Sequence, residues 1–508
     1  MNYFIDPFGC AKNQVDAEMM MARLNDAGWT ACDDPDKADL IIVNSCGFIE
    51  AAKQESINAV LAWRGRYPAY PSPQAAESPR VPAKKILLSG CLAQRYRNEL
   101  AESFPEADGF LGCGEIDKAP EKIAVLFGGE TGSANNAGPR PGSETSLPGF
   151  RPGKQTVGFR PLLGFPGSAY VKISEGCNNR CSFCAIPLIR GPLRCRTVRD
   201  IVEECRVLLD RGVRELCLVG QDLASFLPPE GMGESAGPGA ERRTGLGRLL
   251  AEITRLPGDF WVRCLYLHPD HFPLDILDII ERDGRILPYF DIPFQHASPE
   301  ILAAMNRRGG GEAYLRLLDA IRSRLPGAVI RSTFLTGFPG ETEADFARLL
   351  DFQEKARFDW LGVFTYSRED ATPAYSMKNR PPKKTAAERK ARLEERQIPI
   401  TEERINRFVG RELEVLLEEE LAEGPAGSEA DAVPADTGLW LGRLYCQAPE
   451  VDGAAVVHPA PASVLEQAAI PARPEGTALP LRPGRIRPGT MVRGTVFART
   501  GFDLQIRV

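Results

Sequence analysis

Histidine is scarce in this sequence, and long apolar runs are missing from it. Only four histidines occur among 508 residues, and all of them lie far downstream of the main cysteine motif. A zinc module built from closely spaced cysteines and histidines is therefore not indicated. No uninterrupted apolar stretch reaches about 18 residues, and no basic leader precedes an apolar segment at the amino end. These absences predict a cytoplasmic protein that has no membrane attachment.

Positive charge is not in excess either. Lys and Arg together number 62 against 68 Asp and Glu, which gives a formal net charge of −6. This balance does not favour a general nucleic-acid binder. The 13 cysteines, an odd number spread over a long chain, argue against a secreted disulfide framework. A hydrophobic content of 43% is ordinary for a globular protein, and the length predicts about three domains.

Three cysteines lie within the stretch 172–191, KISEGCNNRCSFCAIPLIRG. Cys177, Cys181 and Cys184 have the spacing C-x3-C-x2-C and follow a strand-like run directly. Three thiolates on one short loop are suited to an iron–sulfur cluster. Because a [4Fe–4S] cluster has four irons, three ligands leave one iron open for another molecule. The alternatives are a fragment of a zinc site and chance clustering.

The first 127 residues alternate between short apolar strands and helices, which predicts a parallel α/β domain. Cys10, Cys46 and Cys91 each follow one of the predicted strands. Because the carboxyl ends of parallel strands meet at one edge of a sheet, this placement predicts a second three-thiolate site. The alternative is burial as small hydrophobic residues. That interpretation fits most of Cys32, Cys113, Cys205, Cys217, Cys264 and Cys446.

The rest of the chain predicts two further domains. Six strand–helix units follow one another in the middle of the sequence, which predicts a partial (βα)6 barrel with the cysteine loop after its first strand. Strands separated by turn residues near the carboxyl end predict a small antiparallel β-barrel. The predicted organisation of this α/β chain is an N-terminal domain at 1–127, a linker at 128–160, a central domain at 161–398 and a β-barrel at 399–508. Pro/Gly-rich insertions are predicted at 67–82, 228–247, 422–436 and 459–488.

With both cysteine sets in place, the chain resembles the radical S-adenosylmethionine (radical SAM) methylthiotransferases of the RimO/MiaB family. FGCAKNQVDAE, IIVNSCGFIEAAKQES and LLSGCLAQRY resemble the N-terminal cluster domain of that family, and EGCNNRCSFCAIPLIRG resembles its radical SAM signature. RSTFLTGFPGETEADF resembles its late-barrel motif, and GRLYCQAPEVDG resembles its C-terminal TRAM barrel. Phe8 and Ala11 stand where the family usually has leucine and proline. The resemblance covers nearly the whole chain.

The resemblance implies two [4Fe–4S] clusters and S-adenosyl-L-methionine as cofactors. Cys177, Cys181 and Cys184 would hold the cluster that cleaves S-adenosylmethionine to a 5′-deoxyadenosyl radical, which abstracts hydrogen from the substrate. A second cluster, which supplies the sulfur, would be held by Cys10, Cys46 and Cys91. No catalytic side chain beyond these ligands is implied. Candidates for further contacts with S-adenosylmethionine are Phe183, Gly220, Gln221 and Arg331.

The family has two branches that differ in substrate. One modifies the β-carbon of an aspartate in the small-subunit ribosomal protein S-twelve, and the other modifies an adenosine in tRNA. Phe294-Gln295-His296 resembles the ribosomal-protein branch, which the chain matches best. Residues 410–508 carry nine Arg, no Lys and fourteen acidic residues, a net charge of −5. An acidic barrel suits a basic ribosomal protein and argues against direct tRNA binding.

The same residues bear on further partners and on alternative functions. The resemblance implies an electron donor such as flavodoxin or ferredoxin, and a sulfur donor. A tRNA methylthiotransferase is the nearest alternative function. An electron carrier of the ferredoxin type would need four thiolates for each cluster, and a zinc-binding nucleic-acid module would need a fourth ligand for each set.

Overall fold

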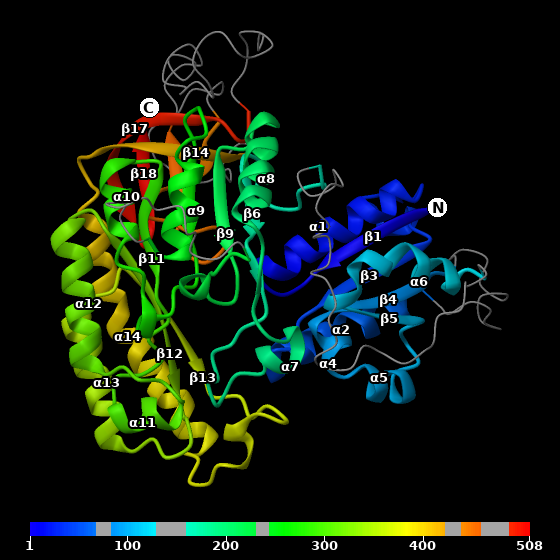
Figure 1. Ribbon diagram of the computed structural model, residues 1–508, viewed down its shortest axis with the longest axis horizontal. Coiled ribbons are helices and arrows are strands. Elements are labelled where there is room, and N and C mark those ends of the chain that lie inside the picture. Colours follow the sequence, from blue (N-terminus) through cyan, green and yellow to red (C-terminus); the bar gives the residue numbers. More distant parts are fainter. Residues whose placement is uncertain (68–82, 129–158, 230–242, 422–437, 459–486) are drawn as a thin grey trace, which may run out of the picture.

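Three sheets organise the chain in a computed structural model (Figure 1). The structure describes residues 1–67, 83–128, 159–229, 243–421, 438–458 and 487–508. The predicted insertions lie wholly or largely outside these ranges. Of the predicted linker, only residues 128, 159 and 160 lie inside them. No helix within the described ranges is both long and apolar enough to span a membrane.

The N-terminal domain is a five-stranded parallel sheet in the order β2-β1-β3-β4-β5 with helices around it. Its central strand is completely buried, as expected for an apolar run covered on both faces. The predicted parallel α/β domain is confirmed. The strands are β1 (Asn2–Pro7), β2 (Thr30–Ala31), β3 (Leu40–Ser45), β4 (Lys85–Gly90) and β5 (Gly109–Gly112). The helices are α1 (Ala11–Asp26), α2 (Glu50–Arg66), α4 (Cys91–Arg95), α5 (Arg97–Ser103) and α6 (Ala119–Leu126), with 3-10 turns η1 (Pro35–Lys37) and η2 (Cys113–Lys118).

The central domain is a six-stranded parallel sheet in the order β13-β12-β11-β10-β9-β6. The predicted partial (βα)6 barrel is therefore confirmed. Its strands are β6 (Ser168–Lys172), β9 (Glu215–Val219), β10 (Trp261–Cys264), β11 (Ile286–Asp291), β12 (Val329–Thr336) and β13 (Trp360–Thr365). A short antiparallel pair, β7 (Ser174–Glu175) and β8 (Arg194–Cys195), flanks the cysteine loop.

Helices cover the outer face of this sheet, and polar caps define where several of them begin. Thr197 accepts a hydrogen bond from the backbone N–H of Asp200, and Thr342 forms a capping box with Asp345. The helices are α7 (Ile186–Arg190), α8 (Val198–Asp210), α9 (Gly245–Ile253), α10 (Ile276–Arg282), α11 (Pro299–Ala304), α12 (Gly311–Arg324), α13 (Glu343–Ala356) and α14 (Lys383–Asn406). Three 3-10 turns lie in the connecting loops: η3 (Leu223–Ser225), η4 (Pro269–His271) and η5 (Pro373–Ser376).

The C-terminal domain is a closed barrel in the order β14-β15-β16-β18-β17. The predicted barrel is confirmed, but one neighbouring pair, β16 with β18, is parallel and the other four pairs are antiparallel. The four-residue strand β16 was not predicted from the sequence. The strands are β14 (Glu412–Glu420), β15 (Trp440–Leu444), β16 (Ala455–His458), β17 (Met491–Thr500) and β18 (Asp503–Arg507).

A buried ion cluster joins the C-terminal barrel to the central sheet. Glu215, at the start of β9, pairs with Arg263 at 2.8 Å and with Arg443 of β15 at 2.6 Å. Burial alone would raise the pKa of Glu215, but the two guanidinium groups outweigh it and lower this pKa to about 2. The carboxylate therefore stays ionised and couples the two domains.

This cluster predicts a loss of stability in acid. The ordinary pKa of Glu215 is 4.5 and its pKa in the folded protein is about 2, so the folded state favours the ionised form. The contribution of Glu215 to the free energy of unfolding is complete above pH 4.5 and is lost as the pH falls toward about 2. Urea unfolding at several pH values should show this slope, and the slope should be smaller in Glu215→Gln. An unchanged slope in the variant would show that other carboxylates cause the acid loss.

Candidate metal centres and cofactor site

The three N-terminal cysteines lie at the carboxyl ends of three adjacent strands, β1, β3 and β4. Cys10 precedes α1, Cys46 follows β3, and Cys91 is the first residue of α4. The loop after Cys46 touches the next strand end, since a Cβ on Gly47 would stand 2.7 Å from the carbonyl oxygen of Cys91. The topology thus places all three cysteines at one edge of the sheet.

The electrostatics of these thiols reflect their closeness. Burial raises the pKa of Cys46 to about 12, and the neighbouring Cys91 and Cys10 add to that rise. The pKa of Cys91 is lowered to about 6, first by a hydrogen bond from Cys113 and then by the charge of Arg190. Cys46 thus favours the thiol and Cys91 the thiolate when no metal is bound.

The second set lies on the loop between β7 and α7. Cys184 donates its backbone N–H to the carbonyl of Cys181 at 3.1 Å, and the N–H of Cys177 bonds Gly191 at 3.2 Å. Asn179 in the same loop donates to the carboxylate of Asp222 at 2.8 Å, which ties the loop to the end of β9. Cys177, Cys181 and Cys184 are therefore held on one short, braced turn.

Burial and mutual proximity also raise the pKa values of these thiols. The pKa of Cys184 rises to about 12, with Cys181 and Cys177 among its causes, and that of Cys177 rises to about 11. Binding of a metal would have to displace these protons. In the described ranges no three His, Cys, Asp or Glu side chains surround a single-ion position. An iron–sulfur cluster does not need three ligands around one ion, because each thiolate binds its own iron. The donor set, two groups of three soft thiols, fits iron–sulfur clusters.

A glycine with positive φ precedes a cysteine in each set. Gly90 has φ +96, and a Cβ there would lie 2.5 Å from the carbonyl oxygen of Ser45. Gly176 has φ +75, and its Cβ would lie 2.1 Å from the carbonyl oxygen of Pro192. Only glycine permits these approaches, which bring Cys91 and Cys177 against the neighbouring chain segments.

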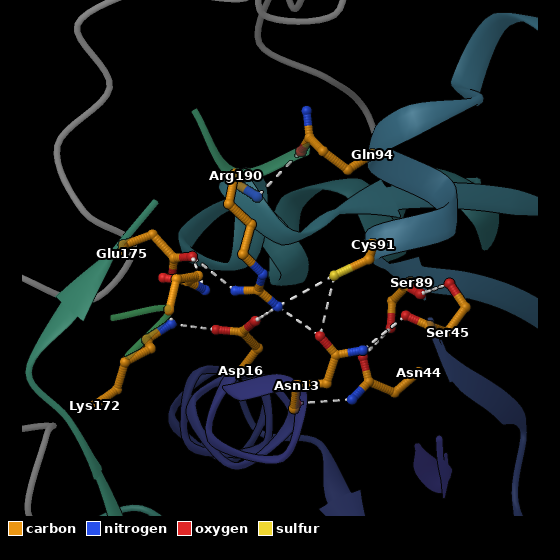
Figure 2. A network of polar contacts seen from close by, with 12 residues as sticks. Asn13, Asp16, Asn44, Ser45, Ser89, Cys91, Gln94, Lys172, Glu175 and Arg190 are labelled. Carbon is orange, nitrogen blue, oxygen red and sulfur yellow. Dashed lines mark hydrogen bonds and ion pairs between the residues drawn. The ribbon is translucent and has the colours of Figure 1, made fainter. Parts of the chain in front are cut away.

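A buried network of charged side chains joins the two cysteine regions (Figure 2). Arg190, at the end of α7, reaches into the N-terminal domain, where its Nη2 contacts Cys91 Sγ at 3.2 Å and Asp16 at 3.0 Å. Its Nη1 pairs with Glu175 at 2.8 Å. Lys172 bridges the same two carboxylates, with Glu175 at 2.7 Å. Two cations thus face two carboxylates and the sulfur of Cys91 in a buried site.

Asn13 extends this network to the carboxyl end of β3. Its side-chain oxygen accepts a hydrogen bond from Arg190 at 2.5 Å and lies 3.2 Å from Cys91 Sγ, and its amide donates to the carbonyl of Ser45 at 2.8 Å. Asn44 returns a bond to the backbone of Asn13. This network was not predicted from the sequence. A lysine within the buried strand β6, and charged residues inside the cysteine motif, were the signals that could have revealed it.

Three of the four other predicted cofactor contacts lie near the cysteine loop. Phe183 packs against the central core, with the guanidinium of Arg307 at 6.0 Å from its ring. Gly220 follows β9 directly, and a Cβ there would stand 2.6 Å from Ser174 Oγ. Gln221 points an amide nitrogen toward Glu175 at 3.5 Å, while its buried side-chain oxygen has no partner. That oxygen is available to a ligand.

Arg331 lies elsewhere. It is the third residue of β12 and so stands near the amino end of that strand, whereas a position at a strand end was predicted for it. Asp291 holds its guanidinium at 3.1 Å, and Asp452 of the C-terminal domain lies 3.6 Å away. Its charge is therefore already balanced within the protein.

A lysine that the sequence analysis did not single out faces the central domain beside the first cysteine set. Lys12 is 8% exposed, and its ammonium stands 3.7 Å from the centre of the Tyr266 ring. Tyr266 follows β10 and has φ +67, an uncommon backbone conformation for an aromatic residue. Burial lowers the pKa of Lys12, but Cys10, Tyr266 and Asp291 outweigh this effect and raise it. Lys12 therefore remains a cation.

Comparisons with known proteins agree with this architecture. Residues 2–112 match the model of the uncharacterized protein family UPF0004, and residues 171–352 match that of the radical SAM superfamily. The chain also resembles the solved structure of the radical S-adenosylmethionine methyltransferase TsrM from Kitasatospora setae, with a TM-score of 0.51. The alignment covers 84% of this chain and 79% of that one. At 17% identity, this likeness shows a shared fold.

Full-length relatives carry the decisive similarity. The ribosomal protein uS12 methylthiotransferase RimO of Treponema denticola is 42% identical over 99% of both chains. The proteins of the same name from Syntrophomonas wolfei and Aquifex aeolicus are 36% and 37% identical, over 90% and 89% of this chain and 93% and 89% of theirs. The chain therefore belongs to the RimO/MiaB family of radical SAM methylthiotransferases, on its RimO branch.

Proposed function

We propose that this enzyme transfers a methylthio group to the β-carbon of an aspartate in the small-subunit ribosomal protein uS12. The observation that carries the proposal is the full-length similarity to relatives named for that substrate. The acidic carboxyl-terminal region supports it, because a basic ribosomal protein is attracted to such a surface.

The two cysteine sets would hold the two clusters. Cys177, Cys181 and Cys184 would bind the one that interacts with S-adenosylmethionine, and Cys10, Cys46 and Cys91 would bind the other. These groups, when bound, supply the radical and sulfur chemistry that no protein side chain can perform. Phe183, Gly220 and Gln221 would line the cofactor site.

The chain's own residues would orient this chemistry. Arg190 ties α7 to Cys91, so the two cysteine regions keep a fixed separation. Asp222 fixes the second loop through Asn179 and also accepts from His271 at 2.7 Å. Rigid placement of two reacting centres reduces the entropic cost of bringing them together. Arg331, held by Asp291 and Asp452, would contribute positive charge to the barrel interior and contact S-adenosylmethionine only if these pairs opened.

The test offers the enzyme both candidate substrates. Protein prepared without oxygen, loaded with iron and sulfide, is incubated with S-adenosylmethionine, a reductant, and either a uS12 loop peptide or a tRNA anticodon stem. We expect the peptide to gain one methylthio group on its aspartate, measured by mass spectrometry with fragmentation. A peptide in which asparagine replaces the aspartate is the control.

Two outcomes would contradict the proposal. Modification of the RNA alone would assign the enzyme to the tRNA branch. Formation of 5′-deoxyadenosine with neither substrate modified would show that the radical forms but that uS12 is not its target.

A further inference from the structure

We propose that Lys12 is the anchor for the side-chain carboxylate of the substrate aspartate. This inference rests on the proposed function, because it assumes that the substrate is an aspartate. It assigns to a residue of the N-terminal domain a direct role in holding the peptide.

No anionic side chain among the described residues is bonded directly to the ammonium of Lys12. Within the described part of the chain it forms no hydrogen bond or ion pair, and its contact is the face of Tyr266 at 3.7 Å. A buried charge normally requires a paired and hydrogen-bonded counter-charge. A cation on an aromatic ring recovers only part of that energy. The ammonium of Lys12 is therefore free to bind an anion.

Other buried cations nearby differ from Lys12 because each is paired with a carboxylate. Lys172 and Arg190 share the carboxylates of Asp16 and Glu175. Arg331 is paired with Asp291. The carboxylate of Asp291 is held by that guanidinium at 3.1 Å. An incoming carboxylate would thus meet a free positive charge at Lys12.

The position of Lys12 also supports this role. Lys12 lies two residues after Cys10, at the start of α1. Tyr266, under its ammonium, accepts a backbone hydrogen bond from Leu223, which adjoins the Asp222 that braces the other cysteine loop. A carboxylate bound at Lys12 would therefore lie between the two cysteine regions. The β-carbon is bonded directly to that carboxyl group, so an anchor there fixes the reacting carbon.

The test is a cycle of two protein forms and two peptides. Dissociation constants of cluster-loaded wild type and Lys12→Met are measured by fluorescence anisotropy for a labelled uS12 loop peptide with aspartate and for its asparagine counterpart. Methionine replaces the unbranched stem of the side chain and removes its terminal ammonium. In wild type the asparagine peptide should bind about tenfold to a hundredfold more weakly, as for a lost charge-assisted hydrogen bond. In Lys12→Met the two peptides should bind equally.

Control variants separate this role from a structural one. Lys37→Met removes an exposed lysine from the same domain and should preserve the wild-type preference for aspartate. Lys12→Arg should retain part of it, and Lys12→Gln replaces Lys12→Met if that variant loses its iron or unfolds. A neutral variant that keeps the full preference, or a wild type that binds both peptides equally, would overturn the anchor. A wild type that neither binds nor modifies the aspartate peptide would overturn the proposed function itself.

Discussion

Replacing Arg190 by methionine is expected to lower the free energy of unfolding by about 3–5 kcal/mol, the cost of breaking a buried charge network from one side. The side chain is 1% exposed and pairs with both Asp16 and Glu175. Without it, those carboxylates share the single ammonium of Lys172. One negative charge is then left uncompensated in a site that excludes water, so a large effect is expected.

The measurement is urea unfolding of the full-length protein, followed by tryptophan fluorescence at neutral pH. Arg206→Met is the matched control, because Arg206 forms an exposed ion pair with Glu203 on α8. Such a pair contributes about 0–1 kcal/mol. Arg190→Lys should give an intermediate loss, because lysine restores the charge but not the fork that reaches Asp16 and Glu175 together. A loss in Arg190→Met no larger than in Arg206→Met would show that the network does not stabilise the domain interface.

The other large effect concerns the two cysteine sets. Changing Cys177, Cys181 and Cys184 together to alanine should reduce the iron content from about eight to about four atoms per chain. It should also abolish the formation of 5′-deoxyadenosine, because the cofactor would lose its binding cluster. Changing Cys10, Cys46 and Cys91 together should remove the same amount of iron but preserve 5′-deoxyadenosine formation, while the peptide is no longer methylthiolated.

Iron analysis and chromatography of the nucleoside product check these expectations. The control changes three other cysteines, Cys32, Cys205 and Cys446, which belong to neither set, and should retain about eight irons. If the variant of Cys10, Cys46 and Cys91 kept all its iron, the N-terminal site would be refuted. If it still methylthiolated the peptide, the sulfur would have to come from another place.

Much of the fold could be predicted because its elements are encoded locally. The apolar run at β3 predicts a buried strand of a parallel sheet from local sequence alone. The edge that carries the candidate site is predicted by the cysteines that follow successive strands. The short strand β16 was missed because four residues carry little periodicity, and its parallel pairing with β18 depends on how the barrel closes.

Contacts between domains were the least predictable. Arg190 stands inside the cysteine motif, yet its partner Asp16 belongs to a helix more than 170 positions earlier. Arg331 was predicted to be a cofactor contact from its place at a strand end, but its guanidinium pairs with Asp291 and lies near Asp452 of another domain. The partners of such side chains depend on tertiary packing, which a single sequence does not reveal.

The contact between Arg190 and Cys91 also orders events during synthesis. These residues are 99 positions apart, so the N-terminal domain leaves the ribosome and begins to fold before Arg190 has been added to the chain. Until then Asp16 lacks its guanidinium partner, and the wall beside Cys91 is missing. The surroundings of Cys91 are thus completed only when the second domain docks. If Cys10, Cys46 and Cys91 hold a cluster as proposed, iron and sulfide would meet the complete set of surrounding residues only after the central domain has been made.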